Sequence, residues 1–436
     1  MRIDRLNIVN FKKFEVQDFD FHPHFTLLVG DNGSGKTSVL DALAVALGIW
    51  LVRPPDSEVW NSGRNLLRNE IRLVPSREGD RIQFREDVPA IITARGNIAG
   101  QEGIVWARSN WGSQRTRNLE AQRALEIVES VYQRDRLGEK LICPVLAYYG
   151  AGRAWLPSNK RSKEKAKSNG PARRWAAFYD CFNERIRFAE LHTWFLGELI
   201  AGANRGGRMR PGFEVVKRAI LRCVPDASNV WYNSDLKQIV LSIGGITQPF
   251  DNLSAGQRMM LALVADLAIK AVTQNAFLVP PDELGPENEF PRVLQETPGV
   301  VLIDELDVHL HPKWQRHVAT DLKKTFPGIQ FVCTSHSPQV IGELRPEEVR
   351  LLDGGQVTTP TRSFGIDSSR VLEELMNANS RNKKVEEKLS ELAAAIDRED
   401  FLQSEQLLKE VENILGETDP EVTHYRTLMS FLRESK

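Results

Sequence analysis

A glycine-rich run with one lysine separates an apolar stretch from an apolar-periodic stretch near the N-terminus. It reads GDNGSGKTS and fits the spacing GxxxxGK[ST]. Glycines there let the backbone curl, so that its N–H groups and the following helix start point at phosphate oxygens. The lysine would reach the β- and γ-phosphates, and the threonine hydroxyl would ligate Mg²⁺. The predicted nucleotide-binding residues are Gly30, Asp31, Asn32, Gly33, Ser34, Gly35, Lys36, Thr37 and Ser38.

Two adjacent acids end a second apolar run, VVLIDE, at Val300–Glu305. A buried strand would deliver Asp304 to the Mg²⁺ shell beside Thr37, and Glu305 to a position where it polarises water. Alone, such a pair also fits an ordinary helix cap. Together with the phosphate loop it predicts binding of ATP or GTP.

Three further features narrow the class of nucleotide machine. LSAGQR at Leu253–Arg258 opens a long helix, and Ser254 lies near its N-terminus, where a hydroxyl and free N–H groups receive a γ-phosphate. Asp307 follows Glu305 closely. TSHSP places His336 after the next buried strand, where an imidazole would sense the γ-phosphate or the attacking water.

These residues need an α/β framework to position them. Apolar runs predict buried strands at 25–30, 140–150, 299–306 and 329–337, and helical spacing follows the phosphate loop, Ser254 and Pro312. The aromatic-rich stretch 175–200 predicts a helix, and 276–298 predicts a surface loop. Apolar residues on single helical faces after Val385 predict a helical tail.

Charge is unevenly distributed along the 436 residues, although the formal net charge is only −1. Arg153–Arg187 holds ten Lys or Arg against three acids, and Glu373–Lys436 holds nine against fifteen. The basic stretch is either a solvated loop or a contact surface for nucleic acid or a partner. The acidic tail is either a hairpin that completes the fold or a docking module.

Composition excludes several other classes. The first 25 residues carry no secretion signal and no run approaches 18 apolar residues, so we expect a cytoplasmic protein with no membrane span. Four widely spaced cysteines predict buried thiols rather than disulfides or zinc. His309 and His311 in HLHP have no third ligand nearby, so a metal there is disfavoured.

The motif order resembles the ABC-type ATPase heads of the SMC, RecF and OLD group. The resemblance implies ATP and Mg²⁺ as cofactors, Glu305 as general base and His336 as switch. It also implies a homodimer or higher homo-oligomer in which two heads sandwich ATP. The residues that would act on the opposing protomer's ATP are Ser254, Ala255, Gly256 and Gln257, with Asp307 at the dimer seam.

Two positions depart from that group's pattern. Ala255 stands where many signatures have glycine, a small change that still allows close approach. The glutamine usually found after a middle strand is missing, because AYYGAGR ends in Arg153 instead. The second departure concerns how the helical insertion that begins at residue 153 is coupled to the Mg²⁺ site.

A narrower resemblance rests on PVLAYYGAGR, WF, LSAGQR and SFGIDSSRVLEELM, which are similar to the ATPase subunit of Septu and retron-Septu antiphage systems. It implies a regulatory ATPase that controls an HNH nuclease subunit, together with a retron reverse transcriptase and its RNA or DNA in retron versions. The alternative is a RecF-like DNA-repair ATPase that clamps DNA through its own basic surface, residues 153–212.

The expected fold class is α/β: an ABC-type P-loop ATPase head with a mixed sheet and flanking helices, a short helical arm insertion and a C-terminal helical module. The predicted divisions are an N-terminal head lobe at 1–152, a basic helical arm at 153–228, a C-terminal head lobe at 229–370 and a partner-docking module at 371–436.

Overall fold

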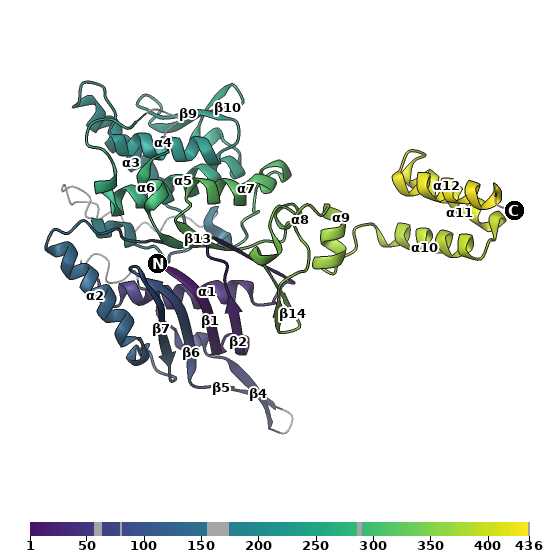
Figure 1. Cartoon of the computed structure of the whole chain (residues 1–436), viewed down its shortest axis with the longest axis horizontal. Coiled ribbons are helices and arrows are strands. Elements are labelled where there is room, and N and C mark those ends of the chain that lie inside the picture. Colours follow the sequence, from purple (N-terminus) through teal and green to yellow (C-terminus); the bar gives the residue numbers. More distant parts are fainter. Residues whose placement is uncertain (56–62, 79–80, 155–173, 286–289, 435–436) are drawn as a thin grey trace. The chain divides into compact units, whose positions relative to one another are not determined.

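The computed structural model describes residues 1–55, 63–78, 81–154, 174–285 and 290–434 (Figure 1). The chain divides into two compact units, Met1–Ile366 and Asp367–Lys436. The first unit is α/β and the second is helical, so each is described by itself.

A six-stranded mixed sheet forms the centre of the first unit. Its strand order is β15-β14-β3-β13-β12-β8, with five neighbouring strands parallel and only β15 antiparallel to β14. The strands are β3 (Phe25–Gly30), β8 (Val145–Tyr149), β12 (Gly299–Ile303), β13 (Ile329–Thr334), β14 (Val349–Asp353) and β15 (Gln356–Thr358). Because the parallel strands end at one edge, the residues that follow β3, β12 and β13 are brought together.

Helices cover both faces of this sheet, as the continuous apolar runs of β8, β12 and β13 require. On one face α1 (Lys36–Leu47) shares a buried cluster with Leu146, Leu302 and Val332. On the other face Tyr149 contacts α5 (Ala255–Gln274). Further helices of this unit are α2 (Gln122–Arg136), α4 (Pro211–Cys223), α6 (Arg292–Glu296), α7 (Pro312–Thr325) and α8 (Pro338–Ile341).

A four-stranded antiparallel sheet of order β2-β1-β6-β7 packs against α1. Alternating residues of β1 such as Leu6 and Ile8 are buried, as in a strand with one face on the core. A separate hairpin, β4 with β5, extends from this lobe (Figure 1). These strands are β1 (Arg2–Phe11), β2 (Phe14–Asp20), β4 (Leu73–Glu78), β5 (Arg81–Glu86), β6 (Ala90–Ile98) and β7 (Gln101–Asn110).

The predicted helix over 175–200 is wrong in its first half. Only a short 3₁₀ turn forms at Arg174–Phe178, and α3 begins at Phe188 and ends at Ala203. Between them the backbone runs along the free edge of β8, where Tyr148 and Gly150 donate N–H bonds of 2.8 and 2.9 Å to the carbonyls of Cys181 and Glu184. Unpaired N–H groups at a buried sheet edge need acceptors, and this pairing outweighs the helical pattern.

Two other expectations need correction. The strands expected over 140–150, 299–306 and 329–337 are shorter, because β8 starts at Val145, β12 ends at Ile303 and β13 ends at Thr334. The expected surface loop 276–298 contains a 3₁₀ turn at Ala276–Leu278 and the helix α6, while 286–289 lie outside the described residues. Before Ser254, β9 (Ala227–Asn233) and β10 (Gln238–Ile243) form an antiparallel hairpin, and β11 (Ile246–Pro249) pairs with the other side of β10.

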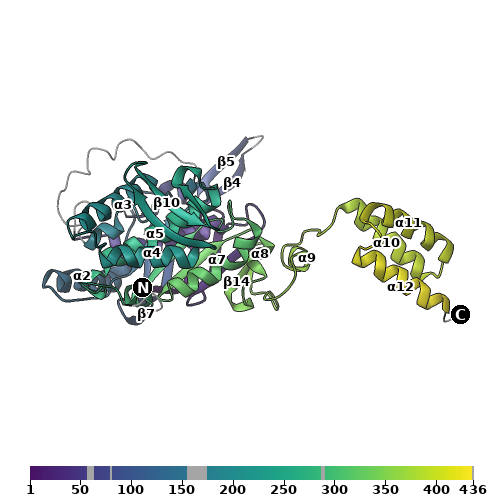
Figure 2. The same cartoon turned by 90° about the horizontal axis from the view of Figure 1, so that it is seen from above.

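The second unit is a three-helix module with its own core. The helices α10 (Lys383–Asp397), α11 (Phe401–Leu415) and α12 (Pro420–Glu434) lie side by side (Figure 2) and follow a short α9 (Ser368–Arg370). Leu392 and Val411 are buried between them, as the apolar faces of the tail predicted.

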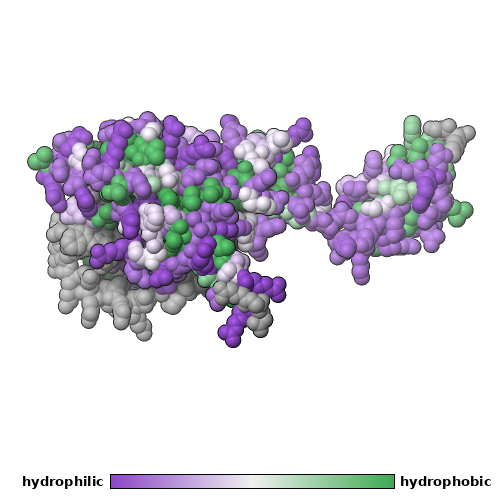
Figure 3. Space-filling view, turned by 90° about the horizontal axis from the view of Figure 1, so that it is seen from below, coloured by the Kyte–Doolittle hydropathy of each residue, from purple (hydrophilic) through white to green (hydrophobic). Residues whose placement is uncertain are grey.

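The molecular face drawn in Figure 3 is mostly hydrophilic, with hydrophobic side chains in small scattered groups. Within the described part of the chain, none of the helices combines the length and the apolar character needed to cross a membrane. All four cysteines are buried and free, which confirms the prediction of buried thiols.

Candidate nucleotide-binding site

The residues after β3, β12 and β13 line a pocket of about 320 Å³ at one edge of the six-stranded sheet. Most residues of the predicted phosphate loop lie here with both acids of VVLIDE and with His336. The lining is Lys12, Lys13, Asn32, Gly33, Gly35, Lys36, Thr37, Ser38, Asp304, Glu305, Thr334 and His336. Segments almost 300 positions apart in the sequence therefore meet, as the motif order predicted.

The phosphate loop is a tight turn that ends at the start of α1. Gly35 has φ +104°, and a Cβ there would lie 2.6 Å from the ring of Phe14, so only glycine fits. The Lys36 ammonium donates to the carbonyls of Gly30 and Asp31 at 2.7 and 3.0 Å. Burial lowers the pKa of Lys36, and the nearby Asp304 opposes that shift. Phosphate oxygens would offer this ammonium better acceptors than loop carbonyls.

Asp304 is held by two threonines. Its Oδ2 accepts a 2.9 Å hydrogen bond from Thr37 of α1, and its Oδ1 accepts a 2.6 Å bond from Thr334 at the end of β13. A hydroxyl and a carboxylate oxygen side by side form the hard-oxygen set that Mg²⁺ prefers. Sequence reasoning missed Thr334, although the pairing of Ile303 with Cys333 places the next residue of β13 beside Asp304.

Glu305 sits on a constrained turn. Its φ is +49°, a conformation uncommon for residues other than glycine, and its N–H donates to Thr334 Oγ1 at 2.7 Å. The carboxylate side chain is half-buried and lines the pocket. His336, which follows the neighbouring strand β13, also lines the pocket. Its backbone N–H donates to Asp307 Oδ1 at 3.4 Å. The structure therefore links the predicted base, switch and seam residues.

Two lysines of the β1–β2 turn also reach the pocket, and the sequence reasoning did not single them out. Lys13 donates to the carbonyl of Gly33 at 2.6 Å, and Lys12 forms an ion pair with Asp41 of α1. They bring positive charge to a site for a polyanion. The only sequence signal is a Lys-Lys pair between two alternating strands, which lies next to the phosphate loop only in the folded chain.

The signature residues, Ser254 to Gln257, were predicted to act on the ATP of a second copy. They are not among the described residues that line this pocket. Ser254 is exposed and caps α5, its Oγ accepting a 3.2 Å bond from the N–H of Gln257 while Gln257 Oε1 accepts a 2.9 Å bond in return. A Cβ on Gly256 would lie 2.4 Å from the carbonyl of His309, so the start of α5 packs closely on the segment after Glu305. Ala255 is the first residue of α5.

Arg153 occupies the place where a glutamine was expected. Its side chain is only 4% exposed and contacts the residues that follow β8 and β12. Nη1 donates to the carbonyls of Gly150, at 3.1 Å, and Asp304, and Nη2 donates to the carbonyl of Glu305 at 2.9 Å. Burial lowers the pKa of Arg153, and the nearby acids, Asp304 first, oppose the shift.

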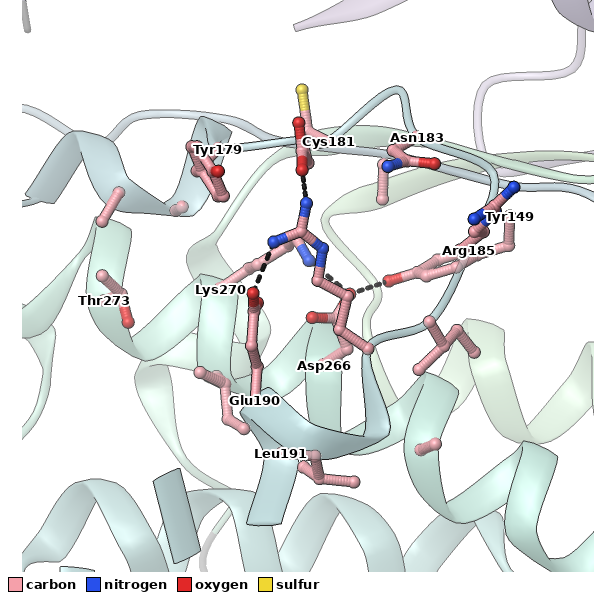
Figure 4. Close-up of a pocket in the computed structure, with 18 of the residues that line it drawn as sticks. Tyr149, Tyr179, Cys181, Asn183, Arg185, Glu190, Leu191, Asp266, Lys270 and Thr273 are labelled. Carbon is pink, nitrogen blue, oxygen red and sulfur yellow. Dashed lines mark hydrogen bonds and ion pairs between the residues drawn. The ribbon is translucent and has the colours of Figure 1, made fainter. Parts of the chain in front are cut away.

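A second pocket, of about 240 Å³, lies where α5 meets β8 and the segment 176–187 (Figure 4). There Asp266 lies between Tyr149, whose hydroxyl donates a 2.5 Å hydrogen bond, and Lys270, which forms an ion pair with it. None of the predicted site residues lines this pocket. The bond from Tyr149 to Asp266 ties β8 to α5.

Comparison with known proteins gives two domain matches. A model described as an AAA domain matches residues 5–193, and one described as an AAA domain, putative AbiEii toxin, Type IV TA system, matches residues 240–342. The first spans the phosphate loop and the second spans Ser254, Asp304 and His336, so the two matches together cover both halves of the pocket.

Several curated proteins are similar over most of the chain. Retron Vc95 probable ATPase of Vibrio cholerae is 25% identical, covering 81% of this chain and 74% of that protein. Retron Ec83 probable ATPase of Escherichia coli is 26% identical, covering 87% and 77%. Septu protein PtuA of Bacillus mycoides is 24% identical over 80% of this chain but 40% of its own length.

Among solved structures, an SMC head bound to the C-winged helix domain of ScpA aligns with a TM-score of 0.48 at 16% identity, over 83% of this chain and 98% of that one. The first unit has the mixed sheet and flanking helices expected of a P-loop ATPase head. The two matches to AAA domains and the relatives named probable ATPases identify the chain as an ATPase, and over most of its length it is similar to proteins named as retron ATPases and as Septu PtuA.

Proposed function

We propose that this protein is the regulatory ATPase subunit of an antiphage defence complex. In this proposal two copies close head to head around ATP, and the closed or open state of the dimer controls an associated HNH nuclease. The likeness to retron ATPases and Septu PtuA supports the defence role. A retron reverse transcriptase and its nucleic acid would be further partners.

The observation that carries the ATPase chemistry is the chain of contacts from Thr37 through Asp304 and Thr334 to Glu305. Thr37 and Asp304 would hold Mg²⁺, which neutralises charge on the β- and γ-phosphate oxygens. Lys36 binds the same phosphates. Glu305 accepts a proton from the attacking water and orients it in line with the γ-phosphorus, and His336 senses the γ-phosphate from the neighbouring strand.

The position of Ser254 and Gln257 supports the proposed dimer. Ser254 and Gln257 are outside the pocket's described lining, and Ser254 is exposed, although a signature helix acts on nucleotide. The Ser254 hydroxyl, the Gln257 amide and the backbone N–H groups at the start of α5 suit a γ-phosphate presented by another copy. The seam would run through Asp307, because the start of α5 packs on the segment after Glu305.

Phosphate release by the full chain with Mg²⁺-ATP tests the enzymatic part. Lys36→Ala should abolish ATP binding, whereas Glu305→Gln should retain binding and lose turnover by about 100-fold or more. Turnover at the wild-type rate by Glu305→Gln would reject Glu305 as the base. Co-expression with the neighbouring genes, followed by purification and mass measurement, should recover an HNH nuclease in the complex. Its absence would reject the regulatory role.

A DNA clamp of the RecF type is the second candidate function, and the ten Lys or Arg within Arg153–Arg187 favour it. Part of that stretch, 155–173, lies outside the described residues. A clamp would bind duplex DNA by itself, with affinity falling steeply as salt rises. Salt-insensitive or absent DNA binding by the purified chain would leave the defence role as the account of this site.

A further inference from the structure

The side chain of Arg153, in the turn that follows β8, reaches the turn after β12 that carries Asp304 and Glu305. The N–H of Asp304 donates to the carbonyl of Tyr149 at 2.8 Å, so the two strand ends are in register. The chain then turns at Gly150, and Arg153 points back between the strand ends. Its guanidinium donates to the carbonyls of Asp304 and Glu305, the two acids of the site.

Arg153 is an unusual group to bury at this place. It is 4% exposed, its guanidinium donates to backbone carbonyls, and its Nε has no hydrogen-bond partner among the described residues. Burying a guanidinium without a directly bonded carboxylate costs free energy. A planar fork can, however, hold two carbonyls at fixed spacing, which a shorter neutral side chain cannot do.

The Glu305 peptide is clamped from both sides. Thr334 Oγ1 accepts its N–H at 2.7 Å, while Arg153 Nη2 donates to its carbonyl at 2.9 Å. With φ at +49°, this residue is in a conformation that surrounding contacts must hold in place. The direction of the Glu305 side chain therefore depends on both clamps, and only the carbonyl clamp comes from the turn after β8.

The turn that carries Arg153 is itself fixed. The N–H of Gly150 donates to the carbonyl of Glu184, and a Cβ on Gly150 would lie 2.5 Å from Glu184 Oε2. The segment that contains Glu184 therefore packs directly on this turn. On the other face of β8, Tyr149 is bonded to Asp266 of α5 (Figure 4). Arg153 is thus presented from a rigid support.

From these contacts we propose that Arg153 is a positioning residue for hydrolysis, which orients Glu305 through its main-chain carbonyl. The proposal rests on the proposed function in one respect, the role of Glu305 as general base. Arg153 itself is not part of the described pocket lining, so it acts on the attack step and not on ATP binding.

The test uses the full chain with Arg153→Gln, Arg153→Lys and a control, Arg174→Gln. Arg174 also donates to backbone carbonyls, those of Leu141 and Gln274, away from the pocket. Arg153→Gln should lower kcat by about 100-fold, the cost of a displaced catalytic group, with KM within about twofold. Arg153→Lys should recover part of the loss, and Arg174→Gln should retain wild-type kcat.

The decisive comparison places Arg153→Gln in a Glu305→Gln background. If Arg153 acts through Glu305, the double variant turns ATP over no more slowly than Glu305→Gln alone. Equal losses in both backgrounds, an Arg153→Gln kcat within about twofold of wild type, or a matching rise in KM would each overturn the proposal.

Hydrogen exchange in the protein without nucleotide separates this proposal from the proposed function. Amides of the segment around Glu305 and Val308 should exchange faster in Arg153→Gln than in wild type and in Arg174→Gln. If Glu305→Gln hydrolyses ATP normally, the general-base role falls, while the exchange result still decides whether Arg153 holds this turn. Unchanged exchange there would reject the positioning role.

Discussion

Thr334 offers the sharpest test of how the site is built, because its one buried hydroxyl bonds both the Asp304 carboxylate and the Glu305 backbone N–H. Its Oγ1 donates to Asp304 Oδ1 at 2.6 Å and accepts the Glu305 N–H at 2.7 Å, and the residue is 0% exposed. Thr334→Val keeps the shape and removes both bonds. Thr334→Ser is the matched control, since it keeps the hydroxyl and removes one methyl.

The expected magnitudes follow from the hydrogen bonds and the methyl group that each variant removes. A hydrogen bond to a carboxylate and a buried N–H left unpaired together predict a decrease of about 3 kcal/mol in the free energy of unfolding for Thr334→Val. Removal of one buried methyl predicts about 1 kcal/mol for Thr334→Ser. Turnover should fall about 10- to 100-fold in the valine variant, because the backbone N–H of Glu305 then loses the hydrogen bond that helps to position this residue.

Denaturant unfolding followed by tryptophan fluorescence measures this difference in the right part of the molecule. All nine tryptophans lie in the first unit, the last being Trp314, so the C-terminal helices do not contribute to the signal. Phosphate release measures the turnover of the same samples. Equal stability and equal kcat for the valine and serine variants would refute the role given to this hydroxyl.

Three further predictions concern the signature segment and the second unit. Ser254→Arg should leave ATP binding by the single chain intact and block ATP-dependent dimerisation, and an unchanged dimer in size-exclusion chromatography would contradict this. Gly256→Ala adds a Cβ 2.4 Å from the His309 carbonyl, so it should lower the free energy of unfolding by roughly 1–3 kcal/mol. A variant as stable as the wild type would contradict the close packing of α5 on His309. Removal of residues 367–436 should preserve ATP binding, because the pocket lies within the first unit, and should release the nuclease. Co-purification of the nuclease with the truncated chain would disprove a docking role.

Short-range spacing was enough to predict the centre of the site. The phosphate loop, Asp304, Glu305 and His336 each follow an apolar strand, and parallel strands end at one edge, so linear motifs translate directly into proximity. The roles given to these residues remain proposals. The start of α5 just after Ser254 could also be predicted, because Ser-x-x-Gln is a local capping-box signal.

What the sequence did not reveal depends on contacts between distant segments. Lys13 reaches the phosphate loop only because β1 and β2 turn beside α1, and Arg153 reaches Glu305 only because β8 pairs with β12. The helix expected from Trp175 onward failed for the same reason. Its aromatic spacing fits a helix, yet the open edge of β8 captures the backbone between Cys181 and Glu184.

The central claim is that the phosphate loop of one copy and Ser254 of another enclose the same ATP. Light scattering of the Glu305→Gln full chain with and without Mg²⁺-ATP tests it most directly. We expect a change from the 49.3 kDa of one chain to twice that mass when ATP is added, and no change for Lys36→Ala. A mass that is the same with and without ATP would contradict it.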